Sequence, residues 1–163
     1  MTALPFAPFG LKPIKPKLGG ELRVQTFKIK SAYATSLYPG DPVILAGEDE
    51  FINIYAPSGS NILGVFAGGQ YDAGAGTQLT HEVWTGGTTA SGTITAFVYA
   101  DPDLEYEIQA DATLAAADAN YNCELAIGTP SAIAKKSGAY LDASEKATTA
   151  TLPVRILGIS NLE

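Results

Sequence analysis

Three carboxylates stand at alternate positions of the sequence, at Asp101, Asp103 and Glu105, and this spacing could hold a metal cation. Calcium-binding loops place their oxygen ligands at alternate positions in the same way. The run lacks, however, the glycine and the bidentate glutamate that follow in such a loop. Pro102 presets the backbone of a tight turn, and an aspartate side chain can cap it. We therefore predict a turn and assign no metal to it.

His81 is the only histidine of the chain, and Cys123 is its only cysteine. A metal site built from several histidines and an intrachain disulfide are therefore excluded. The neighbours Glu82 and Trp84 do not complete a catalytic triad with the histidine, and no histidine lies near the cysteine in the sequence. We interpret the histidine as a polar residue at the surface or a strand edge, and the cysteine as a buried, inert thiol. The chain is not expected to be an enzyme.

Phe66, Tyr71 and Trp84 could line a face on which a sugar ring stacks, or they could pack inside the protein. The sequence leaves both interpretations open. Residues 68–76 are rich in glycine, but no lysine with serine or threonine follows them, so a phosphate-binding loop is not expected. The sequence thus predicts no cofactor, and we do not expect a small-molecule ligand.

The residues on either side of the acidic turn form the clearest structural pattern of the chain. An apolar run, 96–99, precedes the turn, and apolar residues alternate with polar ones over 104–111. An alternation of period two predicts a strand with one buried face and one exposed face. We therefore predict a β-hairpin over 95–111 whose exposed face is acidic.

Short apolar or alternating segments recur along the rest of the chain, and turn-forming residues separate them. Eight to ten short strands with such spacing are typical of a β-sandwich or a β-barrel. Residues 112–121, rich in alanine, are the only plausible helix, with Asp111 or Thr113 as its N-cap. The expected fold is all-β: a single β-sandwich or β-barrel domain over 21–163, whose last strand covers 152–159.

Residues 1–20 differ from this body because they contain four prolines. Proline fixes φ and removes a backbone donor, so the sequence predicts an extended, Pro-rich N-terminal arm. The apolar side chains between the prolines suit an arm that lies on a neighbouring subunit; the alternatives are a disordered tail and an arm that packs on its own domain. The residues expected to bind the partner are two phenylalanines and three lysines: Phe6, Phe9, Lys12, Lys15 and Lys17. Gly19 and Gly20 would form the bend, and deleting residues 2–18 should leave the body folded.

Charge is distributed unevenly between these two parts. Residues 1–30 hold six Lys and Arg and one acid, a net charge of +5, whereas residues 31–163 hold four and sixteen, a net charge of −12. An acidic body has no basic face for phosphates, so nucleic acid is not an expected partner. No apolar run approaches the roughly 20 residues of a membrane span, and the N-terminus has no signal-peptide pattern, so we expect neither a membrane partner nor secretion.

Five short strand-and-turn segments follow one another along most of the body. They are 38–43 (YPGDPV), 62–68 (ILGVFAG), 99–102 (YADP, preceded by Trp84), 106–111 (YEIQAD) and 152–158 (LPVRILG). Taken in this order, they resemble the capsid cement or head-decoration proteins of tailed bacteriophages. The resemblance implies a β body on the outside of a capsid, often as a trimer, and it carries no catalytic residue over to this chain.

The function that the resemblance implies is that of a structural protein that decorates and cements a bacteriophage capsid by bridging major capsid protein subunits on its outer surface. The implied partners are the major capsid protein and the chain itself as a homotrimer. The implied location is the virion, after assembly in the host cytoplasm, which also suits a lone cysteine. The alternative is a carbohydrate-binding or adhesin-like β module on a phage particle, which would need exposed aromatic side chains near Trp84. A small β-fold enzyme would need convergent polar groups that the sequence does not show.

Overall fold

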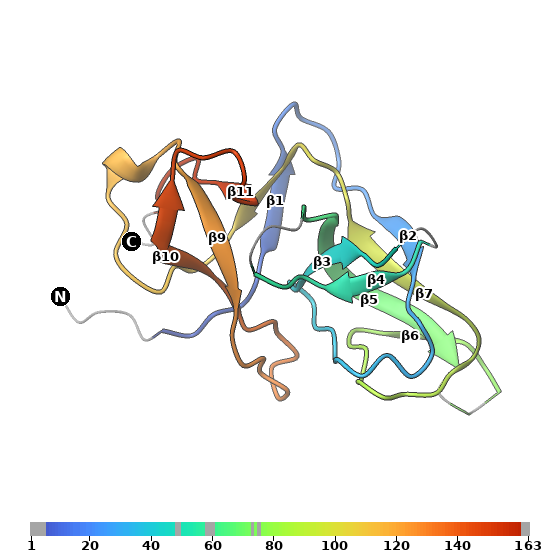
Figure 1. Cartoon of the computed structure of the whole chain (residues 1–163). Coiled ribbons are helices and arrows are strands. Elements are labelled where there is room, and N and C mark those ends of the chain that lie inside the picture. The colour runs from blue at the N-terminus through green and yellow to red at the C-terminus, as the bar shows by residue number, and fades with distance from the viewer. Residues whose placement is uncertain (1–5, 48–49, 58–60, 73, 75, 161–163) are drawn as a thin grey trace.

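The computed structural model in Figure 1 describes residues 6–47, 50–57, 61–72, 74 and 76–160. The expectation of an all-β chain is confirmed, since the elements in these residues are eleven strands and one 3₁₀ turn, and several antiparallel sheets pack together as in a β-sandwich. No helix in this part of the chain is long and apolar enough to cross a membrane. The elements are β1 (Lys12–Pro16), β2 (Gln25–Lys28), β3 (Pro42–Leu45), β4 (Ile52–Ile54), β5 (Gly64–Asp72), β6 (Leu79–His81), β7 (Ser91–Tyr99), β8 (Leu104–Glu107), η1 (Ala116–Asp118), β9 (Asn122–Ile127), β10 (Ala139–Ala147) and β11 (Val154–Arg155).

The largest sheet has six strands in the order β2-β7-β5-β3-β4, with β6 also paired to β5. Its two ends meet, because the amide of Lys28 in β2 donates to the carbonyl of Glu50 (2.9 Å) and Lys28 pairs with Phe51 just before β4. The sheet thus curls into a small barrel. Its interior is filled by aromatic and branched side chains, among them Phe66 and Trp84. Alternation along β7, where Ile94, Ala96 and Val98 are buried, follows the period of two.

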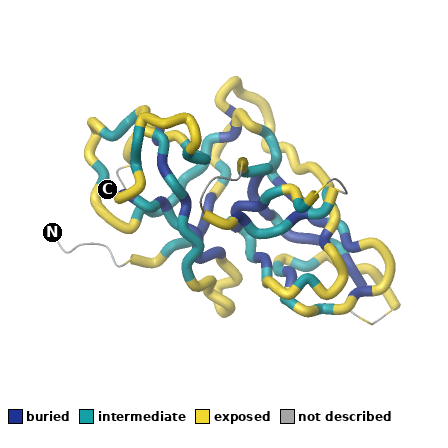
Figure 2. Tube along the Cα trace, viewed as in Figure 1, coloured by how far each residue is buried: buried dark blue, intermediate teal, exposed yellow. Residues whose placement is uncertain are grey.

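A second lobe is built on the three-stranded sheet β10-β9-β11. Its core, which includes Leu125 and Leu141, packs against Tyr55 and Val65 from the outside of the barrel. The hydroxyl of the buried Tyr55 donates to the carboxylate of Glu124 on β9, and this bond ties the lobes together. In Figure 1 this lobe lies on the left, the barrel on the right, and β1 and β8 between them. Figure 2 shows that buried segments run through both lobes.

The hairpin predicted over 95–111 is wrong, although its turn is right. The turn forms as expected: the amide of Asp103 donates to the Asp101 side chain (2.9 Å), and that of Leu104 donates to the Asp101 carbonyl (3.2 Å). After the turn, however, β8 pairs with β1, while β7 stays in the barrel between β2 and β5. Both edges of β7 are already occupied there, so the chain crosses from one sheet to another at this turn.

The helix predicted over 112–121 is also wrong, since this stretch forms only the single turn η1. Its N-cap is Ala115, not Asp111 or Thr113. None of its residues is buried. A short alanine-rich segment without an apolar face to pack gains too little to offset the cost of starting a helix. The last strand is likewise shorter than the predicted 152–159, because β11 pairs with β9 only at its two residues.

The segment that the sequence assigned to an arm contributes strand β1 to the fold. Lys12 to Pro16 pair with β8 in an antiparallel register, and Leu11 is buried in the core of the second lobe. Proline fits in β1 because the strand pairs on one edge only, where a missing amide donor breaks no second ladder. Residues 1–5 of the expected arm lie outside the described residues.

Candidate functional site

Three segments far apart in the sequence meet where the N-terminal segment joins the body, at a place that we call the junction: Gly10, Gly40, Asp41 and Ser137. The amide of Gly10 donates to the carbonyl of Ala139 (3.2 Å), and that of Leu11 donates to the carbonyl of Gly40 (2.9 Å). The hydroxyl of Ser137 donates to the Asp41 carboxylate (2.5 Å). The junction therefore holds residues 10 and 11 firmly on their own chain.

Asp41 is the charged group at the centre of this junction, and it is only 2% exposed. Its second carboxylate oxygen accepts the amide of Tyr38 (2.7 Å). Burial raises the pKa of Asp41 above its ordinary value, while the bonds from Ser137 and Tyr38 oppose that rise. Because both carboxylate oxygens have donors, the group joins the segment of Tyr38 to that of Ser137, and its role is structural.

The lysines expected to bind a partner lie along and just beyond β1, and two of them are paired within the chain. Lys12 contacts Glu107 (3.2 Å) and Lys15 contacts Glu105 (3.7 Å), across the β1–β8 ladder. Lys17 makes no ion pair in the described part of the chain. Both pairs have well-exposed lysines, so each contributes little to stability. The acidic face of β8 that the sequence predicted is thus partly covered by the chain's own basic residues.

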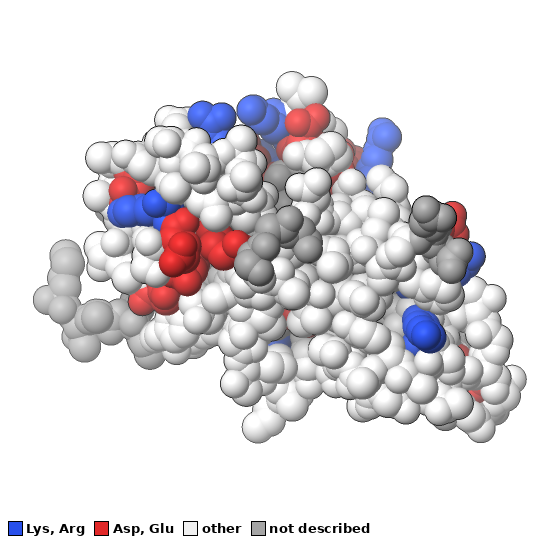
Figure 3. Space-filling view, viewed as in Figure 1, with Lys and Arg blue, Asp and Glu red and all other residues white. Residues whose placement is uncertain are grey.

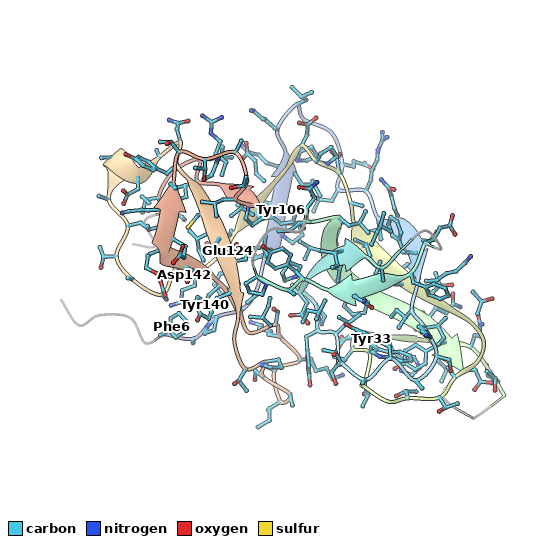
Figure 4. The ribbon with its side chains drawn as sticks, viewed as in Figure 1. Phe6, Tyr33, Tyr106, Glu124, Tyr140 and Asp142 are labelled. Atoms are coloured by element: carbon cyan, nitrogen blue, oxygen red, sulfur yellow. The ribbon has the colours of Figure 1, made fainter. Side chains whose placement is uncertain are left out.

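The two expected anchor residues lie at different places. The ring of Phe6 packs edge-on against Tyr140 with its centroid 5.2 Å away, as Figure 4 shows, yet half of the Phe6 side chain stays exposed. Phe9 is half-buried and forms part of the wall of a surface groove. The structure does not bring the phenylalanines and the lysines into one cluster, and their contact with another subunit stays a prediction.

The groove beside β1 has a volume of about 560 Å³. Its lining is mostly apolar, with Val65, Phe66 and Tyr99 from the barrel and Leu11 from the N-terminal segment. Lys136 also lines it. No group of three or more His, Cys, Asp or Glu side chains that could hold a metal ion occurs in the described residues.

Four exposed apolar side chains follow one another from β1 into the loop before β2. We call them the apolar strip: Ile14, Leu18, Leu22 and Val24. Leu18 is 84% exposed. The loop turns back at Gly19 and Gly20, whose φ values are +79° and +112°, at the top of Figure 1. Ile14 and Leu18 are among the apolar residues of the expected arm, whereas Leu22 and Val24 lie beyond residue 20, where the sequence predicted only the β body.

The aromatic side chains considered for sugar binding are all buried. Phe66 and Trp84 are at most 1% exposed, and Tyr71 packs between Trp84 and the ring of His81, 4.1 Å away. A sugar ring cannot stack on them. The interpretation as core packing is therefore correct for all three residues.

Cys123 is a buried thiol, as the sequence predicted, and its Sγ donates to the carbonyl of Asp142 (3.0 Å). Burial raises the pKa of Cys123 to about 11.

Because the thiolate is the reactive form of Cys123, we expect no labelling of the folded protein by a thiol reagent at pH 8 within an hour, and complete labelling in 8 M urea. Rapid labelling without denaturant would show that β9 opens readily.

Charged side chains are sparse on the face shown in Figure 3, where most atoms belong to neither acids nor bases. The acidic side chains gather mainly over the lobe of β9 and β10. Comparison of the chain with protein families, with curated proteins and with solved structures finds no match. The case for a function therefore depends on the surface of this chain.

Proposed function

We propose that this chain is a structural protein that decorates and cements a bacteriophage capsid, bridging major capsid protein subunits on the outer surface. The proposal combines the sequence resemblance with one observation, the apolar strip. Large apolar side chains that stay exposed on ordered backbone suit contact with another protein. The strip gives the chain a surface for that contact, and a contact of this kind needs no catalytic group.

The residues of the strip and the charged residues beside them suit a protein contact. Burying one leucine or isoleucine side chain contributes roughly 1.5–3 kcal/mol, so a few of them suffice for a stable attachment once the cost of association is met. Lys17 and Arg23 lie in the same loop and make no ion pair in the described residues. Positive charges at the edge of an apolar contact attract an acidic partner and help to orient it.

The alternative of a carbohydrate-binding or adhesin-like module gains no support from the side chains on which it depended, because Phe66, Tyr71 and Trp84 are buried. The same strip would also suit a second copy of the chain. The homotrimer implied by the resemblance is therefore part of the proposal: the chain associates with itself on the particle as well as with the capsid protein.

The double variant Leu18→Ser with Leu22→Ser tests the proposal. We expect it to weaken binding to undecorated capsids of the same genome's major capsid protein by about 100-fold or more, because two apolar contacts of roughly 1.5–3 kcal/mol each are lost. Co-sedimentation over a range of concentrations measures this change. Leu79→Ser on β6 is the matched control, since Leu79 is similarly exposed on the barrel, away from the strip. Equal binding of both variants and the wild type would count against the strip as the contact.

A further inference from the structure

A hairpin-like finger, residues 129–136, projects between β9 and β10 at the bottom of Figure 1. All of its residues are exposed, and at its tip Ile133 is 99% exposed, the highest value among the large apolar side chains of the described residues. An isoleucine that is fully in water contributes nothing to the core of its own chain. Exposing a large apolar side chain to water is unfavourable, so the side chain of Ile133 suits a contact with another molecule.

The finger is held in one conformation by its own hydrogen bonds. Ser131 and Lys136 exchange backbone bonds in both directions (2.9 and 3.1 Å), and the Ser131 hydroxyl accepts the amide of Ala134 (3.2 Å). Lys135 adopts a left-handed backbone, with φ of +49°. Non-glycine residues in that region carry strain that the surrounding bonds must sustain.

The base of the finger is fixed just as firmly. The amide of Gly128 donates to the carbonyl of Gly138 (3.0 Å), and a Cβ on Gly138 would lie 2.5 Å from the carbonyl oxygen of Gly128. The next residue toward the tip, Ser137, is the buried serine of the junction. The tip is therefore pre-positioned, so docking it would cost little conformational entropy.

The finger also carries an unusual share of the body's positive charge. Residues 31–163 contain only four basic residues, and two of them, Lys135 and Lys136, are in the finger. Of the other two, Lys146 contacts Asp118 (2.8 Å) and Arg155 donates to Asn120. Lys135 contacts Glu82 (3.0 Å), whereas Lys136 makes no ion pair in the described residues and lines the groove. Within residues 31–163, whose net charge is −12, the unpaired positive charge of Lys136 is therefore a point at which an acidic partner is attracted.

We propose that the finger inserts Ile133 into an apolar pocket with an acidic rim on a neighbouring major capsid protein subunit, with Lys136 facing that rim. This inference rests on the proposed function and adds a second contact, which is separate from the apolar strip. A buried apolar anchor surrounded by polar contacts is the usual form of a binding hot spot. A lipid surface suits the finger less well, because a single apolar side chain anchors weakly and an acidic body is repelled by anionic headgroups.

The test uses the full chain with two finger variants and two matched controls. Ile133→Ser is expected to weaken binding to undecorated capsids by about tenfold, and Lys136→Glu by a similar factor that shrinks as salt rises. Leu157→Ser, at a 54% exposed leucine just beyond β11, and Lys30→Glu, at an exposed lysine just beyond β2, are expected to bind as the wild type does. All four should unfold at the wild-type temperature within 2 °C or so, because surface changes have small effects on stability.

The possible outcomes separate this inference from the proposed function. If the wild type binds capsids and Ile133→Ser binds equally well, the finger inference is overturned while the proposed function stands. If the wild type does not bind capsids at any concentration, both are overturned. Binding to vesicles with 30% or so of phosphatidylserine that Ile133→Ser abolishes, together with unchanged capsid binding, would also overturn the finger inference in favour of a membrane contact.

Discussion

Replacing Gly10 with alanine is expected to lower the free energy of unfolding by about 3 kcal/mol. A Cβ at this position would lie 2.5 Å from the carbonyl oxygen of Gly40 and 2.5 Å from the Cβ of Ser137. Relieving such contacts in a packed region costs roughly 1–3 kcal/mol. The left-handed backbone of Gly10, with φ of +77°, adds about 1 kcal/mol more for a residue with a side chain.

Gly19→Ala is a close control for this substitution. Gly19 has nearly the same φ, +79°, but a Cβ there would meet no atom within 4 Å. It should therefore lose only the backbone cost of about 1 kcal/mol. Urea unfolding of the two variants and the wild type measures both values. Equal losses for the two variants would mean that the junction is loosely packed and that the N-terminal segment is not held as described.

Replacing Asp41 with alanine is the second substitution with a large expected effect, a loss of about 2–4 kcal/mol. The change leaves the Tyr38 amide and the Ser137 hydroxyl without the acceptor they have now, in a buried place where each unpaired donor costs roughly 1–3 kcal/mol. Asp103→Ala, at an exposed aspartate in the turn between β7 and β8, should cost far less. If both variants unfold at the same urea concentration, the hydrogen bonds of Asp41 do not contribute the predicted stability.

The same carboxylate makes a pH prediction whose sign follows from its raised pKa. The folded state binds the Asp41 proton more tightly than the unfolded state does, because burial raises the pKa above 3.8. The stability gained from this protonation is fully present below pH 3.8 or so and is lost as the pH rises through the folded pKa. The difference in unfolding free energy between the wild type and Asp41→Ala should therefore shrink as the pH rises from 4 to 8. A difference that grows over this range would contradict the description of Asp41.

The sequence predicted the character of each strand better than its partner. Period-two alternation predicted a strand from Leu104, where β8 forms, and Asp101 with Pro102 marked a turn that forms as expected. Alternation tells which face is buried, but it does not tell which strand lies alongside. Pairing depends on packing between distant segments, so the partner of β8 turned out to be β1, about 90 residues away in the sequence.

The candidate site was the harder part to predict. Composition gave residues 1–20 the character of an arm, but Leu11 is a core residue, and its burial depends on the junction with Gly40. A deletion of residues 2–18 would remove β1 and this leucine, so it is no longer expected to leave the body folded. Exposed apolar residues such as Leu18 and Ile133 resemble core residues in a sequence, and only the fold shows that nothing of their own chain covers them.

Electron cryo-microscopy of capsids from the same genome, assembled with and without this chain, tests the proposed function most directly. The account predicts additional β-rich density on the outer surface of decorated capsids, at positions that bridge neighbouring capsid protein subunits, with the apolar strip facing the lattice or a second copy. The density should be lost with the Leu18→Ser and Leu22→Ser double variant and kept with Leu79→Ser. Identical maps with and without a saturating amount of the chain would contradict a role in capsid decoration.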